Sequence, residues 1–389
     1  MSDQVNGPIV HILISVWDKA FIDKFADYAL LTHLSPGNLP ALCVEARVHY
    51  HFYTNAASAD YLESRTRALR PFATIHMRTF ETTQFEGRPL AQHLAPYSGA
   101  AFKNHLNQVS VFHLLDEVAS NQPSEFLFVG DSDLLYSNNA FTEFFQALQS
   151  GAKAIMAPTI RLSLEQSESN LATLLKIDGG LSAKALGGLI AKYPHAAAQA
   201  AYISHDTAPS YPSQMIWPTS NGLLCRTFFP HPVAMLPNPA CRRWESTIDY
   251  DFILHCYPNP DDVRIFTDGA TASICKLSSD KYLEGQLSRS PLQIDLLSDF
   301  LLSSTNEAHR PFAECGVRYS TNPDNSELDQ VDLESAELLS RMYDHRQALL
   351  DRLDVADPVK NIVVRSHFGS IESFLSPERL NRLNAAGQL

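Results

Sequence analysis

The stretch EFLFVGDSDLLYSNN, residues 125–139, places an apolar run directly before two aspartates. Residues 126–129 (Phe-Leu-Phe-Val) carry only apolar side chains, as expected for a strand that is buried on both faces of a sheet. A glycine ends this run, and Asp131, Ser132 and Asp133 follow it. Side chains two residues apart in an extended segment project to the same side. Both carboxylates should therefore face the crevice at the carboxyl end of the strand.

Two neighbouring carboxylates at a strand end suit a divalent cation that is bridged to a diphosphate. Proteins usually hold Mg²⁺ or Mn²⁺ through one or two carboxylates together with phosphate oxygens of the substrate. The alternative is a solvated turn rich in Asp and Asn, without a function. The apolar run before the motif and the Leu-Leu-Tyr after it favour the metal or phosphate site.

Strands and helices alternate before residue 158. Besides the run that precedes Asp131, the patterns predict strands at 9–16, 46–53, 73–77 and 152–157 and helices at 21–34, 58–69, 104–118 and 141–148. Such alternation predicts an α/β, Rossmann-like fold with a mostly parallel sheet and helices on both faces. The ligand should bind where the strand ends meet, near Ser15 and Trp17, near Thr54 and at the two aspartates.

The amino-acid composition of the chain changes after residue 158. Prolines and glycines make 158–245 loop-rich, and we interpret it as a lid or acceptor region. Helical spacing of apolar residues dominates after about residue 285. The predicted organisation is a nucleotide-binding and catalytic domain over 1–285 and a mainly helical C-terminal extension over 286–389.

Composition excludes some classes of partner. The chain has 389 residues, of which 45% are hydrophobic, and a formal net charge of −13. This charge argues against nucleic acid as a general partner, although a local basic pocket for phosphate remains compatible with it. No apolar run is long enough to span a membrane, and the first residues lack a signal-peptide pattern, so a cytoplasmic location is expected.

The cysteines and histidines show no ligand pattern. The six cysteines include no C-x-x-C pair, and isolated cysteines of a cytosolic chain are expected to be small buried hydrophobes. The fifteen histidines have no H-E-x-x-H spacing. Neither residue type predicts a zinc or redox site.

The apolar strand that leads into Asp131-Ser132-Asp133 and then into Leu-Leu-Tyr-Ser-Asn-Asn resembles the D-x-D segment of nucleotide-sugar-dependent glycosyltransferases of the GT-A fold. The resemblance covers this segment and the layout of roughly the first 280 residues. It implies a GT-A type of sheet and a Mn²⁺ or Mg²⁺ ion that Asp131 and Asp133 hold on the donor diphosphate. Lys103 resembles the basic residue that faces the donor phosphates, and His367 resembles a late histidine that serves as a further metal ligand.

Each of these residues also has an ordinary structural explanation. Lys103 stands at the start of a predicted helix, where a solvated lysine is common, and His367 follows a strand-like run at 361–364. Trp17 and Thr54, which are candidates for the nucleoside pocket, are equally compatible with core or turn positions.

A second candidate cluster lies in RRWESTIDYD, residues 242–251, which combines two arginines, a tryptophan and three carboxylates. A carboxylate there can deprotonate an acceptor hydroxyl, so Asp251 and then Glu245 are the candidate catalytic residues. The alternative is an ordinary helix over 247–256 that Ser246 or Thr247 caps.

The sequence therefore predicts a metal-dependent glycosyltransferase of the hexosyltransferase type. The donor is a nucleotide-diphosphate sugar, and the acceptor is a hydroxyl group of a glycan or a small molecule. One alternative is a haloacid-dehalogenase-like phosphatase with Asp131 as nucleophile and Asp133 as acid. Its motif usually lies on the first strand, whereas here it follows some 125 residues of chain. The other alternative is a non-catalytic nucleotide- or sugar-binding protein on a transferase scaffold.

Overall fold

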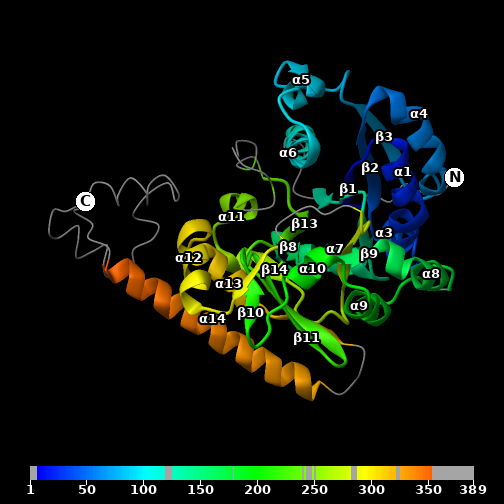
Figure 1. Ribbon diagram of the computed structural model, residues 1–389. Coiled ribbons are helices and arrows are strands. Elements are labelled where there is room, and N and C mark those ends of the chain that lie inside the picture. The colour runs from blue at the N-terminus through cyan, green and yellow to red at the C-terminus, as the bar shows by residue number, and fades with distance from the viewer. Residues whose placement is uncertain are drawn as a thin grey trace, which may run out of the picture.

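The computed structural model describes residues 7–118, 125–177, 179–238, 241, 248, 251–281, 287–320 and 325–352. Within these ranges the centre of the molecule is a seven-stranded sheet with the order β14-β8-β13-β6-β1-β2-β3 (Figure 1). The strands are β1 (Ile9–Ser15), β2 (Arg47–Thr54), β3 (Thr74–Thr79), β6 (Glu125–Val129), β8 (Ala154–Ala157), β13 (His231–Met235) and β14 (Val263–Ile265). Each pairs in parallel with its neighbours except β13, which is antiparallel to both β6 and β8. The mostly parallel α/β sheet is confirmed.

Helices cover both faces of this sheet, as predicted. One face packs on α1 (Lys19–Lys24), the π-helical turn η1 (Phe25–Ala29), α2 (Leu30–His33), α3 (Leu39–Glu45), α4 (Ala56–Arg65) and α7 (Ala140–Gln149). The other face packs on α5 (Leu90–Leu94), α6 (Gly99–Val118) and α11 (Phe252–Cys256). Alternate residues of the strands supply the two cores: Ile12 and Ile14 of β1 belong to the first, and Leu13 belongs to the second.

Smaller sheets accompany the central sheet within the described residues. They are β7 (Leu134–Tyr136), β15 (Ile274–Ser278) and β9 (Ile160–Ser163), in the order β7-β15-β9; β11 (Gln214–Thr219), β12 (Gly222–Thr227) and β17 (Val317–Ser320); β10 (Thr207–Pro209) with β16 (Arg289–Pro291); and β4 (Gln84–Phe85) with β5 (Arg88–Pro89). The remaining helices are η2 (Arg67–Leu69), α8 (Leu164–Leu174), α9 (Ala183–Lys192), α10 (Ala196–Ala200), η4 (Pro260–Asp262), α12 (Ile294–Ser304), η5 (Glu307–His309), α13 (Arg310–Glu314) and α14 (Ser326–Arg352).

The C-terminal region is mainly helical, as predicted, in its described part up to residue 352. Helices α12, α13 and α14 enclose a third apolar core with β11 and β12, and the long α14 runs along the outside of this region (Figure 1). Because β16 pairs with β10 and β17 pairs with β12, residues 289–320 share sheets with the preceding part of the chain. The division at residue 285 stays a prediction, and the strand predicted at 361–364 lies outside the described residues.

Two sequence interpretations need correction. The region 158–245 is less loop-rich than its prolines suggest, because it contributes several helices and strands, including β13 at the middle of the main sheet. Cys241 and Cys256 form a disulfide instead of remaining isolated, whereas Cys225 and Cys275 are free and buried as expected. Disulfides are more common in oxidising compartments than in the cytosol, and the cytoplasmic location stays a prediction. Among the described helices, none is long and apolar enough to cross a membrane.

Candidate functional site

A glycine brings the end of β6 close to β1. A Cβ atom on Gly130 would lie 2.5 Å from the Cδ1 atom of Ile14 and 2.9 Å from the carbonyl oxygen of Leu13. Only a residue without a side chain fits at this distance. The backbone that leads from β6 into the motif therefore lies close against β1 in the centre of the sheet. Asp131 and Asp133 are only 2% and 6% exposed.

The strand after the motif attaches a layer that carries cations. Strand β7 pairs with β15 so that Leu134 lies opposite Lys276, and β15 pairs with β9 so that Lys276 lies beside Arg161. The backbone N–H of Leu277 donates to the carbonyl oxygen of Asp133 at 2.7 Å. These pairings fix Lys276 and Arg161, which are far from the motif in sequence, directly beside it.

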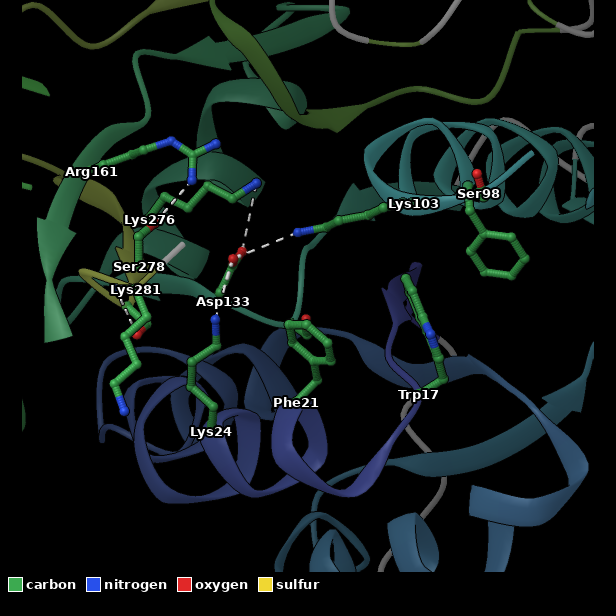
Figure 2. Close-up of a pocket in the computed structure, with 14 residues that line it drawn as sticks. Trp17, Phe21, Lys24, Ser98, Lys103, Asp133, Arg161, Lys276, Ser278 and Lys281 are labelled. Atoms are coloured by element: carbon green, nitrogen blue, oxygen red, sulfur yellow. Dashed lines mark hydrogen bonds and ion pairs between the residues drawn. The ribbon is translucent and has the colours of Figure 1, made fainter. Parts of the chain in front are cut away.

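Three lysines surround the two carboxylates, and Figure 2 shows all three around Asp133. The Nζ atoms of Lys103 and Lys276 lie 2.9 and 3.0 Å from Oδ2 of Asp131, and Lys24 Nζ lies 3.5 Å from Oδ2 of Asp133. Lys103 and Lys276 also lie 3.6 and 3.7 Å from the carboxylate of Asp133. Every lysine of the group thus contacts Asp133, and two of them also contact Asp131.

The lysines determine the ionisation of the pair. Burial by itself would raise the pKa of Asp131, but the charges of Lys103 and Lys276 outweigh it and hold that pKa well below its usual range. Burial and the neighbouring Asp131 also act to raise the pKa of Asp133, and Lys103, Lys276 and Lys24 together lower it. Burial would lower the pKa of Lys103, yet the two aspartates raise it above its ordinary value. Both carboxylates and Lys103 are therefore charged at neutral pH.

A cavity of about 610 Å³ opens above this cluster. One wall is aromatic: the ring centroid of Trp17 lies 5.3 Å from that of Phe102 and 6.0 Å from that of Phe21. The cationic residues that line it are Lys24, Lys103, Arg161, Lys276 and Lys281. Among the described residues of the site, these five cations outnumber the two aspartates, in a chain of net charge −13. An anion with an attached ring system fits this combination of walls.

The structure brings several of the predicted residues together. Trp17, Lys103, Ser132 and Asp133 line the cavity, and Asp131 lies beneath it against Lys103. Ser132 donates its backbone N–H to Oδ1 of Asp131 at 2.8 Å. The carboxyl end of β6 is therefore part of this pocket, and ligand binding there stays a prediction.

Ser15 and Thr54 lie at the neighbouring strand ends but do not line the cavity. Their side chains are 1% and 0% exposed. Neither hydroxyl has a hydrogen-bond partner among the residues that the structure describes. Both positions are covered by protein, so their role in donor binding stays a prediction.

Of the second candidate cluster, residues 242–251, the structure describes only Ile248 and Asp251, and neither lines the cavity. Asp251 is absent from the described lining, and its Oδ1 atom lies 2.5 Å from Nε2 of the buried His309. It directly precedes α11, which begins at Phe252 and not at residue 247 as the capped-helix alternative supposed. Glu245 and His367 lie outside the described residues. The carboxylate of Asp251 thus pairs with His309, and its catalytic role stays a prediction.

Sequence reasoning missed four of the five cations: Lys24, Arg161, Lys276 and Lys281. Lys24 ends a short amphipathic helix, and Lys276 interrupts the otherwise apolar run Ile-Cys-Lys-Leu. A lysine within a buried strand is the one local signal among these, because a charge there needs a partner.

The described residues do not fit a divalent cation at the aspartates. Within these ranges no three histidine, cysteine or carboxylate side chains are placed to hold a metal ion. Oδ2 of each aspartate contacts ammonium groups, and Oδ1 of Asp131 accepts the backbone N–H of Ser132. Oδ1 of Asp133 is buried and lies 3.7 Å from Nζ of Lys276, too far for a hydrogen bond. Two unit charges 4 Å apart interact by about 4 kcal/mol at an effective dielectric constant near 20, so each ammonium would repel a dication by about twice that. The predicted Mn²⁺ or Mg²⁺ site therefore depends on groups beyond those described, such as His367.

Comparisons with known proteins add little to this geometry. No protein-family model matches the sequence, and no curated protein is similar to it in sequence. Among solved structures, the chain is similar to mouse xyloside xylosyltransferase 1 in its apo form, with 19% identity, coverage of 39% of this chain and 53% of that one, and a TM-score of 0.26. It is also similar to 4-diphosphocytidyl-2C-methyl-D-erythritol synthase from Anaerococcus prevotii, with 11% identity, coverage of 40% and 57%, and a TM-score of 0.24. The chain thus spans a little over half the length of each. These values do not assign a family or an activity.

Proposed function

We propose that the protein is a glycosyltransferase that moves a sugar from a nucleotide-diphosphate sugar to a hydroxyl group of a glycan or a small molecule. One observation carries this proposal: three lysines converge on paired aspartates beside an aromatic wall, at the carboxyl end of a central parallel strand. Ligands of open α/β sheets bind at such strand ends. The D-x-D resemblance agrees with this position.

The site contains groups that sugar transfer requires. When the bond between the sugar and the diphosphate breaks, negative charge develops on the leaving phosphate oxygens, and fixed cations that face them lower the barrier. Lys24, Lys103 and Lys276 supply these cations. The faces of Trp17 and Phe21 offer apolar surfaces for the nucleoside base or the sugar ring.

The group that deprotonates the acceptor is a separate question. Asp133 is the one carboxylate among the described lining residues, and the neighbouring lysines lower its pKa, which makes it a weak base. Glu245 and Asp251 stay the predicted catalytic residues. Asp251 would have to leave His309 to reach the acceptor.

A donor screen tests the proposal. The protein is incubated with a panel of nucleotide sugars and candidate acceptors, with and without Mn²⁺, and released nucleoside diphosphate is measured. Lys276→Met should reduce this release by about 10²-fold or more, the effect typical of one lost donor to the leaving group. Lys153→Met is the matched control, because Lys153 also pairs with an aspartate (Asp262, 2.9 Å) but does not line the cavity. Release that is equal in Lys276→Met and in the parent would contradict the proposal.

The same screen distinguishes the two alternatives. A phosphatase of the haloacid-dehalogenase kind would release free phosphate and form a phosphorylated Asp131 that mass spectrometry detects. Its general acid, Asp133, would have to be protonated, whereas the lysines keep this carboxyl ionised. A non-catalytic binding protein would bind a nucleotide sugar and turn over none of the panel.

A further inference from the structure

We propose that the site binds a diphosphate directly through Lys24, Lys103 and Lys276, without a divalent cation, and that Asp131 and Asp133 hold these lysines in place. The identification of the diphosphate as part of a nucleotide sugar rests on the proposed function. The inference concerns the same cavity, but it gives the two aspartates a different task from that of metal ligands.

Depth in the cavity is the first argument. The side chains of Asp131 and Asp133 are 3% and 8% exposed, whereas those of Lys24, Lys103 and Lys276 are 15%, 20% and 20% exposed. The carboxylates are thus the more deeply buried groups of the cluster, and the lysine side chains are the more exposed ones. An anion that enters the cavity meets the lysines first, and a cation would have to pass them to reach the aspartates.

The origin of the lysines is the second argument. Lys24 ends α1, Lys103 lies in α6 and Lys276 is the middle residue of β15, so three separate elements deliver ammonium groups to one point (Figure 2). Lys24 is held further by the carbonyl oxygen of Leu277, to which its Nζ donates at 3.2 Å. Convergence from three sides, with backbone support, produces a fixed cluster of cations.

Valence and charge are the third argument. An ammonium group has three N–H donors, so a lysine that contacts a carboxylate on one side can still donate to a phosphate oxygen on the other. The described lysines of the cluster, Lys24, Lys103 and Lys276, outnumber the two aspartates, and this excess of positive charge attracts the charge of about −2 on the diphosphate of a nucleotide sugar near neutral pH. Lysine charges can therefore replace the neutralisation that a divalent cation supplies in other sites.

Calorimetry with inorganic pyrophosphate tests the inference, once in EDTA and once with Mn²⁺. We expect pyrophosphate to bind the protein in EDTA. Its affinity in EDTA should lie within about threefold of its affinity in the presence of Mn²⁺. Lys24→Met and Lys276→Met should each weaken binding in EDTA at least tenfold, and Lys153→Met should leave it unchanged. Circular dichroism of each variant verifies its fold.

Asp133→Asn separates the two tasks of the aspartates. If Asp133 only holds lysines, this variant keeps pyrophosphate binding in EDTA within a few fold, because Asp131 still holds Lys103 and Lys276 and the site retains all its cations. Binding that requires Mn²⁺ in the parent and disappears in Asp133→Asn would overturn the inference, even when the donor screen still shows sugar transfer. Absence of pyrophosphate binding in both buffers would overturn it as well. Binding in EDTA without turnover of any nucleotide sugar would support the lysine site and contradict the proposed function.

Discussion

Acid should destabilise the fold through a cluster of four histidines in the central sheet: His11 of β1, His49 and His51 of β2, and His76 of β3. The Nδ1 atom of His11 lies 3.0 Å from Nε2 of His51, and Nδ1 of His49 lies 3.0 Å from Nε2 of His76. The rings of His51 and His76 stack with centroids 4.6 Å apart. By strand alternation His11 and His51 lie on the same side of the sheet as Leu13 and Tyr53, which pack in the core with α6.

The expected size of the effect follows from His11. Burial, followed by the charges of His49 and His76, lowers the pKa of His11 from 6.5 to about 4. The unfolded chain therefore takes up a proton as the pH falls through about 6.5, whereas folded His11 stays neutral until about pH 4. Stability is fully present above pH 6.5 and is lost as the pH falls toward 4. Linkage gives a loss of about 2 kcal/mol from this one group between about pH 7.5 and pH 5.

Other charged groups near the cluster do not reverse this sign. Glu125 lies 3.7 Å from Nε2 of His11 and favours its protonation, but burial raises the pKa of Glu125 and so weakens its charge in acid. The positive charges of Arg78 and Arg47 act on His51 and His49, and they lower the pKa values of these two rings together with burial. All four histidines therefore resist protonation in the folded state.

Guanidinium unfolding of the parent and of His11→Gln, at about pH 7.5 and pH 5, measures the effect. The free energy of unfolding of the parent should fall by about 2 kcal/mol more than that of the variant, because only the parent has this titrating group. His205→Gln is the control, since its side chain is 97% exposed. A parent and a His11→Gln variant that lose equal stability on acidification would refute the reasoning.

Three further predictions concern other parts of the molecule. Gly130→Ala should lower the free energy of unfolding by about 1–3 kcal/mol, because its Cβ would lie 2.5 Å from Ile14 Cδ1, and denaturant titration measures this. Cys241→Ser with Cys256→Ser should cost about 3 kcal/mol of stability, since the disulfide closes a loop with a sequence separation of 15, and added reductant should destabilise the parent but not the double variant. Trp17→Ala should weaken nucleotide-sugar binding at least tenfold in calorimetry, as expected for loss of a stacked base, and leave inorganic pyrophosphate binding unchanged. Equal losses for both ligands would place Trp17 outside the base or sugar site.

The parts of the site that the sequence predicts are those with a local signature. An apolar run followed by Asp131 and Asp133 predicts a buried strand with carboxylates at its end, and Lys103 opens a helix with regular apolar spacing just before that strand. Lys24 and Lys276 have no such signature, because what places them at the motif is the pairing of β7 with β15 and the packing of α1. Nonlocal contacts of this kind are decided by the whole fold, and no spacing within one segment encodes them.

Prolines explain the largest error in the predicted elements. They made 158–245 appear loop-rich, yet Pro218 lies in β11, at the edge of its sheet, where a missing N–H leaves no ladder bond unmade. Pro232 lies in β13, a central strand, at a shift in register between Pro232 and Ala234. Edge positions and bulges are where sheets accept proline, and neither is visible before the pairing is known.

The aspartates of the motif are needed in this fold whether or not a metal ion binds. Without Asp131 and Asp133, the ammonium groups of Lys24, Lys103 and Lys276 would face one another at the end of β6 with no opposing charge. Like charges at such distances repel by several kcal/mol, so the empty site would open or lose its lysines from the cavity. Both hypotheses, metal ligation by the aspartates and positioning of the lysines, therefore predict that an aspartate variant loses activity. Pyrophosphate binding in EDTA separates them, because no metal ion takes part in it.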